Sequence, residues 1–186
     1  MSEKLKTDLS KFNNSWFSKG ANPFKLYLWY FVRETFFHSA FPLSSVKVAL
    51  LRMFGARVGK GVVIKPHIII KFPWKLKVGN YVWIGEKVWI ENHALVSIEN
   101  NVCISQGAVL VGGNHDYKKP GFDLITGEIE LKEGSWVGAG AMVCPGTKLE
   151  SHAVLTMGSV GSGVLEAYSI YQGNIAVKIK DRIIRS

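Results

Sequence analysis

The chain has little cysteine and no long apolar run, and each of these absences excludes a class of protein. Its two cysteines, Cys103 and Cys144, match neither a disulfide framework nor a metal or redox spacing. No apolar run reaches the roughly 18 residues of a membrane-spanning helix, and residues 1–18 do not resemble a signal peptide. We therefore expect a cytoplasmic protein of 186 residues with one domain, an N-terminal extension and a sizeable core.

Acidic residues are scarce in the first part of the chain. Residues 1–77 contain 14 Lys/Arg and 3 Asp/Glu, a balance of +11. Residues 78–130 have 3 and 7 (−4), and residues 131–186 have 6 and 4 (+2), which together give the net charge of +9. A basic front end indicates an anionic partner such as phospholipid head groups, pyrophosphate-linked glycans or nucleic acid. Because no nucleic-acid-binding motif accompanies the charge, we expect no nucleic-acid partner.

A repeat is the most informative feature that is present. Four stretches follow one template, at residues 58–64, 78–84, 98–104 and 131–137. Each opens with an aliphatic residue, passes through turn formers and returns to an aliphatic residue six positions later. The first three begin 20 residues apart, and such a short period indicates stacked coils that cannot bury their apolar faces alone.

The repeat resolves into hexads. Apolar residues recur at every sixth position of each coil, at Val58, Ile64 and Ile70, Val78, Ile84 and Ile90, Ile98, Ile104 and Leu110, and then Leu131, Val137, Val143, Leu149 and Leu155. Six residues form one flat side of a triangular prism, and residues one coil apart stack inside it. We predict an all-β fold, a parallel β-helix of about five coils over residues 58–165. A helical extension over 1–57 precedes it, and a short tail over 166–186 follows.

One corner of the predicted prism carries an insertion. The step from the third side of a coil to the next coil is 8 residues twice, but 21 residues after Leu110. The 13 extra residues predict a loop over residues 112–129 that contains Asn114-His115-Asp116-Tyr117. Long loops in compact domains are uncommon and usually functional.

The N-terminal part has its own pattern. Residues 24–41 are rich in aromatic side chains, and residues 44–54 indicate a second, shorter helix that Gly55 ends. One interpretation is a helical cap on the open end of the prism or on a neighbouring subunit. The other is an amphipathic segment on a membrane surface, anchored by Trp16, Trp29 and lysines. The charged pair Arg33-Glu34 in mid-segment favours the cap, and the sequence leaves both interpretations open.

Several motifs together resemble a known family. They are the hexads, the loop with Asn114-His115-Asp116-Tyr117, the tail Gly173-Asn174-Ile175-Ala176, and residues 12–16, 50–56, 64–66, 82–86 and 101–108. They are similar to the hexapeptide-repeat acyltransferases, and to WcaF-type colanic acid biosynthesis acetyltransferases in particular, over about residues 12–180. The resemblance implies a homotrimer of left-handed β-helices with acetyl-CoA in the groove between subunits. The implied acceptor is a sugar hydroxyl of a capsule, exopolysaccharide or O-antigen.

The expected chemistry needs a general base. Moving an acetyl group from a thioester to an alcohol requires removal of the alcohol proton, and a histidine suits that task near neutral pH. His115 matches the family's catalytic histidine, so we expect it to be the base. The backbone N–H groups of Gly138, Ala139 and Gly140 are candidates for stabilising the oxyanion. Asp116, adjacent in sequence, is poorly placed to orient the ring of His115.

The other predicted site residues are divided between cofactor and acceptor. For acetyl-CoA they include the same Gly138-Ala139-Gly140 turn, Ser159, and the basic residues Lys178, Lys180 and Arg182, which would meet the phosphates. For the acceptor they are Asn92, Asn114 and Asp116, although an asparagine at a corner also serves as a turn former.

The remaining histidines and the last coil bear on the metal content and on the reaction class. His67, His93 and His152 occupy corner positions without the five-residue spacing of zinc ligands in related β-helix carbonic anhydrases, so we expect no metal. The last coil departs from the family pattern, with Gly161 at an inward position and Ile175 in place of a proline. N-acetylation of an amino sugar and a non-catalytic trimeric scaffold therefore stay open as alternatives.

Overall fold

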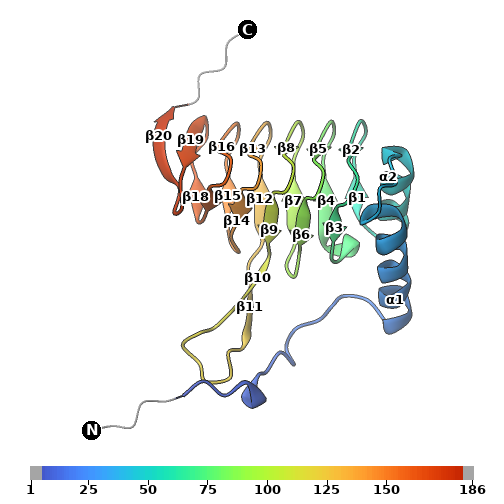
Figure 1. Cartoon of the computed structure of the whole chain (residues 1–186), viewed down its shortest axis with the longest axis vertical. Coiled ribbons are helices and arrows are strands. Elements are labelled where there is room, and N and C mark those ends of the chain that lie inside the picture. The colour runs from blue at the N-terminus through green and yellow to red at the C-terminus, as the bar shows by residue number, and fades with distance from the viewer. Residues whose placement is uncertain (1–5, 182–186) are drawn as a thin grey trace.

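The computed structural model describes residues 6–181. They form a triangular prism of stacked strands, with helices at one end and a hairpin arm at one corner (Figure 1). The stacked coils are the left-handed parallel β-helix that the hexads and the resemblance predict.

Three parallel sheets form the sides of the prism. The first sheet contains β1 (Arg57–Val58), β4 (Leu76–Val78), β7 (Val96–Ile98), β12 (Ile129–Leu131), β15 (Lys148–Leu149) and β18 (Val164–Leu165). The second contains β2 (Val63–Ile64), β5 (Trp83–Ile84), β8 (Cys103–Ile104), β13 (Trp136–Val137), β16 (Val154–Leu155), β19 (Ser169–Gln172) and the antiparallel β20 (Val177–Asp181). The third contains β3 (Ile69–Ile70), β6 (Trp89–Glu91), β9 (Val109–Val111), β14 (Met142–Val143) and β17 (Val160–Gly161).

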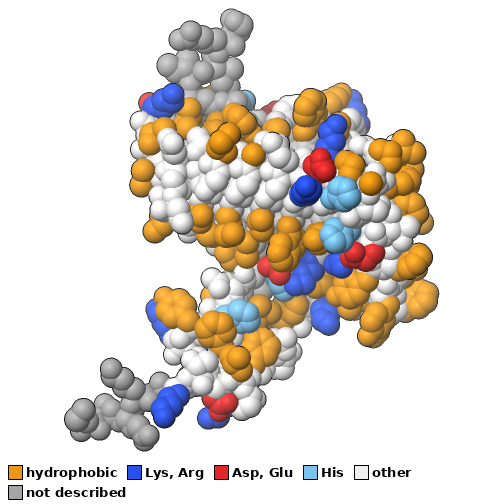
Figure 2. Space-filling view, viewed as in Figure 1, with side chains coloured by type: hydrophobic (Ala, Val, Ile, Leu, Met, Phe, Trp, Pro, Cys, Tyr) orange, Lys and Arg blue, Asp and Glu red, His pale blue; other side chains and the backbone are white. Residues whose placement is uncertain are grey.

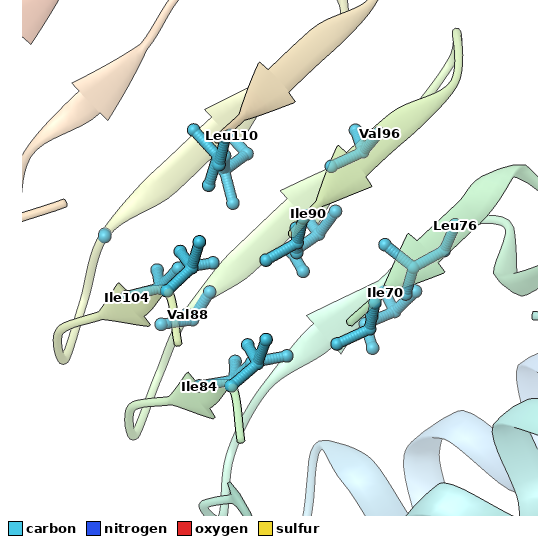
Figure 3. Packing of buried hydrophobic residues seen from close by; sticks show 14 of the residues in the cluster. Ile70, Leu76, Ile84, Val88, Ile90, Val96, Ile104 and Leu110 are labelled. Atoms are coloured by element: carbon cyan, nitrogen blue, oxygen red, sulfur yellow. The ribbon is translucent and has the colours of Figure 1, made fainter. Parts of the chain in front are cut away.

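The strand register confirms the predicted hexads. Residues one coil apart pair across each sheet, so that Ile90 lies between Ile70 and Leu110 in the third sheet. Figure 3 shows these side chains stacked inside the prism, where each is fully buried. At the inward position of Gly161, a Cβ would lie 3.0 Å from Cδ2 of Leu155, so the leucine already occupies the space that an aliphatic residue would fill.

The outer faces of the three sheets differ in chemistry. The first sheet points mostly charged and polar residues outward, namely Arg57, Lys77, Ser97, Glu130 and Lys148. The second and third sheets point mostly apolar residues outward, namely Val63, Trp83, Cys103 and Trp136, and Ile69, Trp89, Val109 and Met142.

Helices cover the open end of the first coil. They are α1 (Pro23–Val32), the π-helical turn η2 (Arg33–Phe37) and α2 (Ser44–Met53). Two short 3-10 turns lie elsewhere, η1 (Leu9–Lys11) in the segment beside the arm and η3 (Pro73–Lys75) within the prism. Asn22 caps α1 by accepting a hydrogen bond from the Lys25 N–H (2.8 Å). Trp29 is fully buried in the core, and its indole N–H donates to the Ile70 carbonyl (3.0 Å). Among residues 6–181, no helix is long and apolar enough to cross a membrane.

A buried lysine closes one edge of the prism beneath the helices. Lys47 of α2 is fully buried, and its ammonium group donates to the Lys65 carbonyl (2.8 Å) and the Ile64 carbonyl (3.5 Å). These carbonyls belong to the chain at and just after β2, the first strand of the second sheet. The lysine therefore occupies an edge that no further coil covers. Burial lowers the pKa of Lys47 to about 8.

The predicted loop is a β-hairpin arm. Strands β10 (Gly113–His115) and β11 (Leu124–Thr126) pair antiparallel and project away from the prism (Figure 1). The N-terminal segment, residues 6–22, runs beside the arm. Its Asp8 N–H donates to the Pro120 carbonyl (2.8 Å), and its Asn13 N–H donates to the Asp123 carboxylate (3.0 Å). Segments far apart in the sequence thus meet at the arm.

Candidate active site

His115 lies at the end of β10, with its ring exposed on the arm. Its Nδ1 is 2.8 Å from the backbone carbonyl oxygen of Phe122. Because a carbonyl can only accept a hydrogen bond, Nδ1 carries a proton, and Nε2 of the neutral ring is left with its lone pair. This is the tautomer that a general base requires. Phe122 adopts a left-handed backbone (φ 56°) in the turn that presents this carbonyl.

Two aromatic rings contact the imidazole of His115. Phe122 stacks on it with ring centroids 4.8 Å apart and planes 14° apart. Phe12, from the N-terminal segment, lies 5.8 Å away at a tilted angle. The carbonyl and the two rings together set the orientation of the imidazole. Asp116 takes no part, since its carboxylate accepts from the Lys118 N–H (3.0 Å).

A cavity of about 530 Å³ opens beside His115 between the arm, the N-terminal segment and the prism. Its lining combines aromatic rings with polar groups, including Phe12, Phe17, Tyr30, Lys71, Glu91 and His93. Figure 2 shows histidine, lysine and acidic side chains gathered where the arm meets the prism. The volume lies in the range of small-molecule sites, and the mixed lining suits a sugar, which has apolar faces and polar edges.

A polar cluster stands on the prism side of this cavity. The ammonium of Lys71 lies 3.1 Å from the carboxylate of Glu91 and 3.0 Å from Nε2 of His93. Burial, followed by the charge of Lys71, lowers the pKa of His93. A Cβ on Gly113 would lie 2.7 Å from Nδ1 of His93, so the root of the arm packs directly against this ring. Sequence reasoning missed this cluster, because its residues come from two coils and share no local motif.

The predicted acceptor residues have different surroundings. Asn114 lines the cavity, and its side-chain oxygen accepts from the His115 N–H (2.8 Å). Asp116 lies in a separate hollow beside Asn13 and Trp16. Asn92 is fully buried, accepts from the Phe72 N–H (2.9 Å) and donates to the carbonyls of Phe72 (2.6 Å) and Lys75 (3.0 Å). The amide of Asn92 thus holds the η3 turn, and its predicted contact with the acceptor stays a prediction.

The turn Gly138-Ala139-Gly140 joins β13 to β14, at the corner between the second and third sheets. The Gly138 N–H donates to the Leu155 carbonyl (2.8 Å), and the Gly140 N–H donates to the Gln106 carbonyl (3.0 Å). These two amides are engaged in joining neighbouring coils. The Ala139 N–H has no hydrogen-bond acceptor among the described residues.

Ser159 lies at the same corner one coil further on. Its hydroxyl is buried, lies 2.9 Å from the Thr156 hydroxyl and accepts from the Gly173 N–H (2.9 Å). The hydroxyl therefore joins the last coil to the tail, and the binding of cofactor at Ser159 stays a prediction. A groove of about 730 Å³ follows this corner along the earlier coils, beside Gly85 and Gln106.

The predicted phosphate-binding residues lie on or after β20. Lys178 pairs with Glu166 (2.7 Å) and Asp181 (3.1 Å), and these hydrogen bonds raise its pKa. Lys180 is exposed, and it pairs with Ile170 where β20 runs antiparallel to β19. Arg182 lies outside the described residues.

The two halves of the predicted site occupy different corners of the prism. The arm with His115 projects from the prism between β9 and β12, at the corner of the third and first sheets. The turn Gly138-Ala139-Gly140 and the groove lie at the corner of the second and third sheets. Within one chain, the outer face of the third sheet therefore lies between His115 and the turn Gly138-Ala139-Gly140.

Known proteins resemble this chain in sequence and in fold. No family model matches the sequence. WcaF of Escherichia coli (strain K12), provisionally named a colanic acid biosynthesis acetyltransferase, is 34% identical over 177 residues, which cover 95% of this chain and 97% of WcaF. WcaF of Shigella flexneri gives the same values.

Solved structures share the fold. A galactoside acetyltransferase in complex with coenzyme A has a TM-score of 0.76 at 18% identity, covering 89% of this chain and 85% of that one. The hexapeptide-repeat acetyltransferase VCA0836 of Vibrio cholerae, complexed with acetyl coenzyme A, has a TM-score of 0.70 at 17% identity, covering 76% and 79%. A mutant of AntD, an N-acyltransferase of Bacillus cereus, has a TM-score of 0.62 at 19% identity, covering 74% and 89%.

Proposed function

Since the chain belongs to the WcaF family of colanic acid biosynthesis acetyltransferases, we propose that it transfers the acetyl group of acetyl-CoA to a sugar hydroxyl during the synthesis of a bacterial surface polysaccharide. Exopolysaccharide, capsule and O-antigen units are the acceptor classes. The observation that carries the proposal is His115, whose Nδ1 is held by the Phe122 carbonyl and whose Nε2 is left as a base beside a cavity of mixed lining.

In the proposed reaction, the acceptor hydroxyl oxygen attacks the thioester carbonyl carbon while Nε2 of His115 takes the hydroxyl proton. The carbonyl oxygen becomes an oxyanion, for which the Ala139 N–H is the remaining donor of the predicted turn. Collapse of the tetrahedral intermediate breaks the carbon–sulfur bond, and the proton on His115 passes to the departing CoA sulfur. The Phe122 carbonyl keeps the ring in one orientation through both proton transfers.

We further propose a homotrimer. The apolar outer faces of the second and third sheets, with Trp83, Trp89 and Trp136 at 61%, 43% and 45% exposure, would pack between subunits. The charged first sheet would face solvent. Such packing would bring the arm of one subunit to the corner of its neighbour that carries Ala139 and the groove. It would thereby join the two halves of the site, with acetyl-CoA between subunits.

The trimer is tested by light scattering on the purified chain. Trp83→Lys together with Trp136→Lys should lower the molar mass and abolish acetyl transfer, because a lysine in an apolar interface leaves a buried unpaired charge. Ser97→Lys on the first sheet is the matched control and should stay trimeric and active. A wild-type chain that is monomeric at working concentration would refute the trimer.

The reaction is tested with acetyl-CoA and two sets of acceptors, neutral sugars that offer only hydroxyls and the corresponding amino sugars. Release of CoA with the hydroxyl set supports O-acetylation. Release with the amino set alone would select N-acetylation, the reaction class of the AntD neighbour. Isothermal calorimetry with CoA addresses the scaffold alternative, since a chain that does not bind CoA would not be an acetyl-CoA-dependent enzyme.

A further inference from the structure

Helix α1 is apolar on two opposite sides. One side, with Leu26, Trp29 and Val32, is buried against the first coil. The other side carries Phe24, Tyr27, Leu28 and Phe31, with exposures of 77%, 70%, 43% and 68%. Their spacing of three, four and seven residues places them on one helix face, here called the outer stripe. A helix that is apolar all round is normally covered on both sides.

No described part of the chain covers the outer stripe. Figure 1 shows α1 and α2 at one extreme of the molecule, with every coil of the prism on their other side. Figure 2 shows hydrophobic side chains along this edge. Leu43 and Met53, next to and within α2, are also exposed, at 54% and 77%. This helical end therefore presents several large apolar side chains to whatever lies beyond it.

The charge around this end identifies the kind of partner. Between residues 9 and 85 the sequence has 12 Lys/Arg and one acidic residue, Glu34. Glu34 is already occupied by Arg33 (2.6 Å) and His38 (2.7 Å). Exposed basic residues occur on α2 and on the first coil beside it, namely Arg52, Arg57, Lys60 and Lys65. A second copy of this end would meet it with like charge, whereas an anionic lipid surface would attract it.

We propose that the helical end of the prism docks on an anionic membrane surface. The outer stripe enters the boundary between head groups and acyl chains, the depth at which aromatic side chains are favoured. The basic residues of α2 and the first coil lie over the lipid phosphates. No residue of the outer stripe lines the cavity at the arm, to which α1 contributes Tyr30 from another side of the helix, so docking needs no part of the acetyl-transfer reaction.

The proposal is tested by co-sedimentation of the full chain with vesicles of phosphatidylcholine, with and without phosphatidylglycerol. We expect binding to the anionic vesicles only, weakening as salt is raised, because the Debye length shortens. The double variant Phe24→Ser, Phe31→Ser should reduce the partition at least tenfold. Tyr117→Ser, which alters an exposed aromatic residue of the arm, is the matched control and should bind like the wild type.

A second pair of variants separates the charge contribution. Arg57→Gln together with Lys60→Gln should weaken binding by roughly fivefold for each residue. Lys118→Gln on the arm should leave binding unchanged. Tyr27→Ser with Leu28→Ser repeats the stripe test if the first double variant does not fold.

Three outcomes would overturn the proposal. One is equal binding to neutral and anionic vesicles, and another is a stripe variant that binds as the wild type does. The third is a stripe variant with a lower molar mass in solution, which would assign the outer stripe to a subunit interface. Acetyl transfer to a water-soluble acceptor should be the same in the wild type and in the Phe24→Ser, Phe31→Ser variant. A failure of the docking proposal can therefore be distinguished from a failure of the proposed reaction.

Discussion

The prism and the hairpin arm differ in how they are held together: the prism by a repeat that every coil shares, and the arm by a few individual contacts. In the prism the inward residues recur from coil to coil, most of them are fully buried, and they lie within a continuous ladder of backbone hydrogen bonds. The arm is a single two-stranded hairpin with an exposed tip, tied to the N-terminal segment by bonds such as that from Asn13 to Asp123. The prism therefore carries the stability, and the arm presents the candidate base.

The difference shows how a repetitive scaffold can hold an irregular site. Coils stacked in register leave few positions free for chemistry, because most backbone amides join one coil to the next, as at Gly138 and Gly140. An insertion at a corner escapes this constraint without disturbing the ladder, since β12 still pairs with β7 on the far side of it. Substitutions in the two regions should therefore differ in what they damage.

The largest effect is expected from His115→Ala. Removal of the base should lower kcat/KM roughly 10²–10⁴-fold, the usual contribution of general base catalysis. The melting temperature and CoA affinity should stay near wild type, because the ring is exposed on the arm. Tyr117→Ala, at another exposed position of the arm, serves as control and should keep activity. Near-normal turnover in the His115→Ala variant would remove this histidine from the mechanism.

In the prism the expected damage is to stability. Ile90→Ala should lower the free energy of unfolding by about 2–5 kcal/mol, because it opens a cavity between Ile70 and Leu110. Ile125→Ala on the arm, where the side chain is 46% exposed, should change it by less than about 0.5 kcal/mol. Denaturant unfolding of both variants at equal protein concentration measures the contrast. Equal losses would mean that the arm and the prism form one cooperative unit.

Lys47 gives the prism a pH dependence in the alkaline range. Its pKa is about 8 when folded against an ordinary value of 10.5, so between these pH values the unfolded chain binds more protons. The free energy of unfolding of the wild type should therefore rise with pH across this window, relative to Lys47→Met, by about 1–3 kcal/mol. Below about pH 8 the difference should be flat.

Chemical denaturation of both proteins at several pH values between neutral and about 10.5 measures this difference. The exposed Lys60→Met is the control, and its difference from wild type should not vary in that window. A Lys47→Met difference that falls as pH rises would contradict the assignment of a buried, easily deprotonated amine.

The smallest effect is expected where the N-terminal segment meets the arm. Asp123 accepts from the Asn13 N–H (3.0 Å) and from Lys119 (3.2 Å), and the first of these bonds contributes most to its lowered pKa. Asp123→Asn should raise the acceptor KM roughly threefold to tenfold with little change in kcat, because Phe12 and Phe17 of the segment line the cavity.

Limited proteolysis gives this prediction a readout besides activity. Cleavage within residues 6–22 should be faster in Asp123→Asn than in wild type, while Glu128→Gln, an exposed acidic residue after the arm, should leave both KM and cleavage unchanged. A normal KM together with normal cleavage would show that the segment is held by other contacts.

The sequence by itself determined the prism, because a six-residue period is a local rule that every coil obeys. The inward residues, the register and the corner of the insertion all followed from counting. The predicted helix over residues 44–54 ends one residue earlier, at Met53, two residues before Gly55. The period also located the loop that carries His115, and the resemblance to the acyltransferases identified this histidine as the candidate base.

Only the tertiary structure decided what surrounds that base. The Phe122 carbonyl orients His115, Phe12 reaches it from the far end of the sequence, and Lys71, Glu91 and His93 meet across two coils. Contacts between residues that are far apart in the sequence produce no repeating pattern, so the period could not predict them. For the same reason the sequence did not show that the predicted site residues Asn92 and Ser159 are buried and form hydrogen bonds with neighbouring coils or the tail.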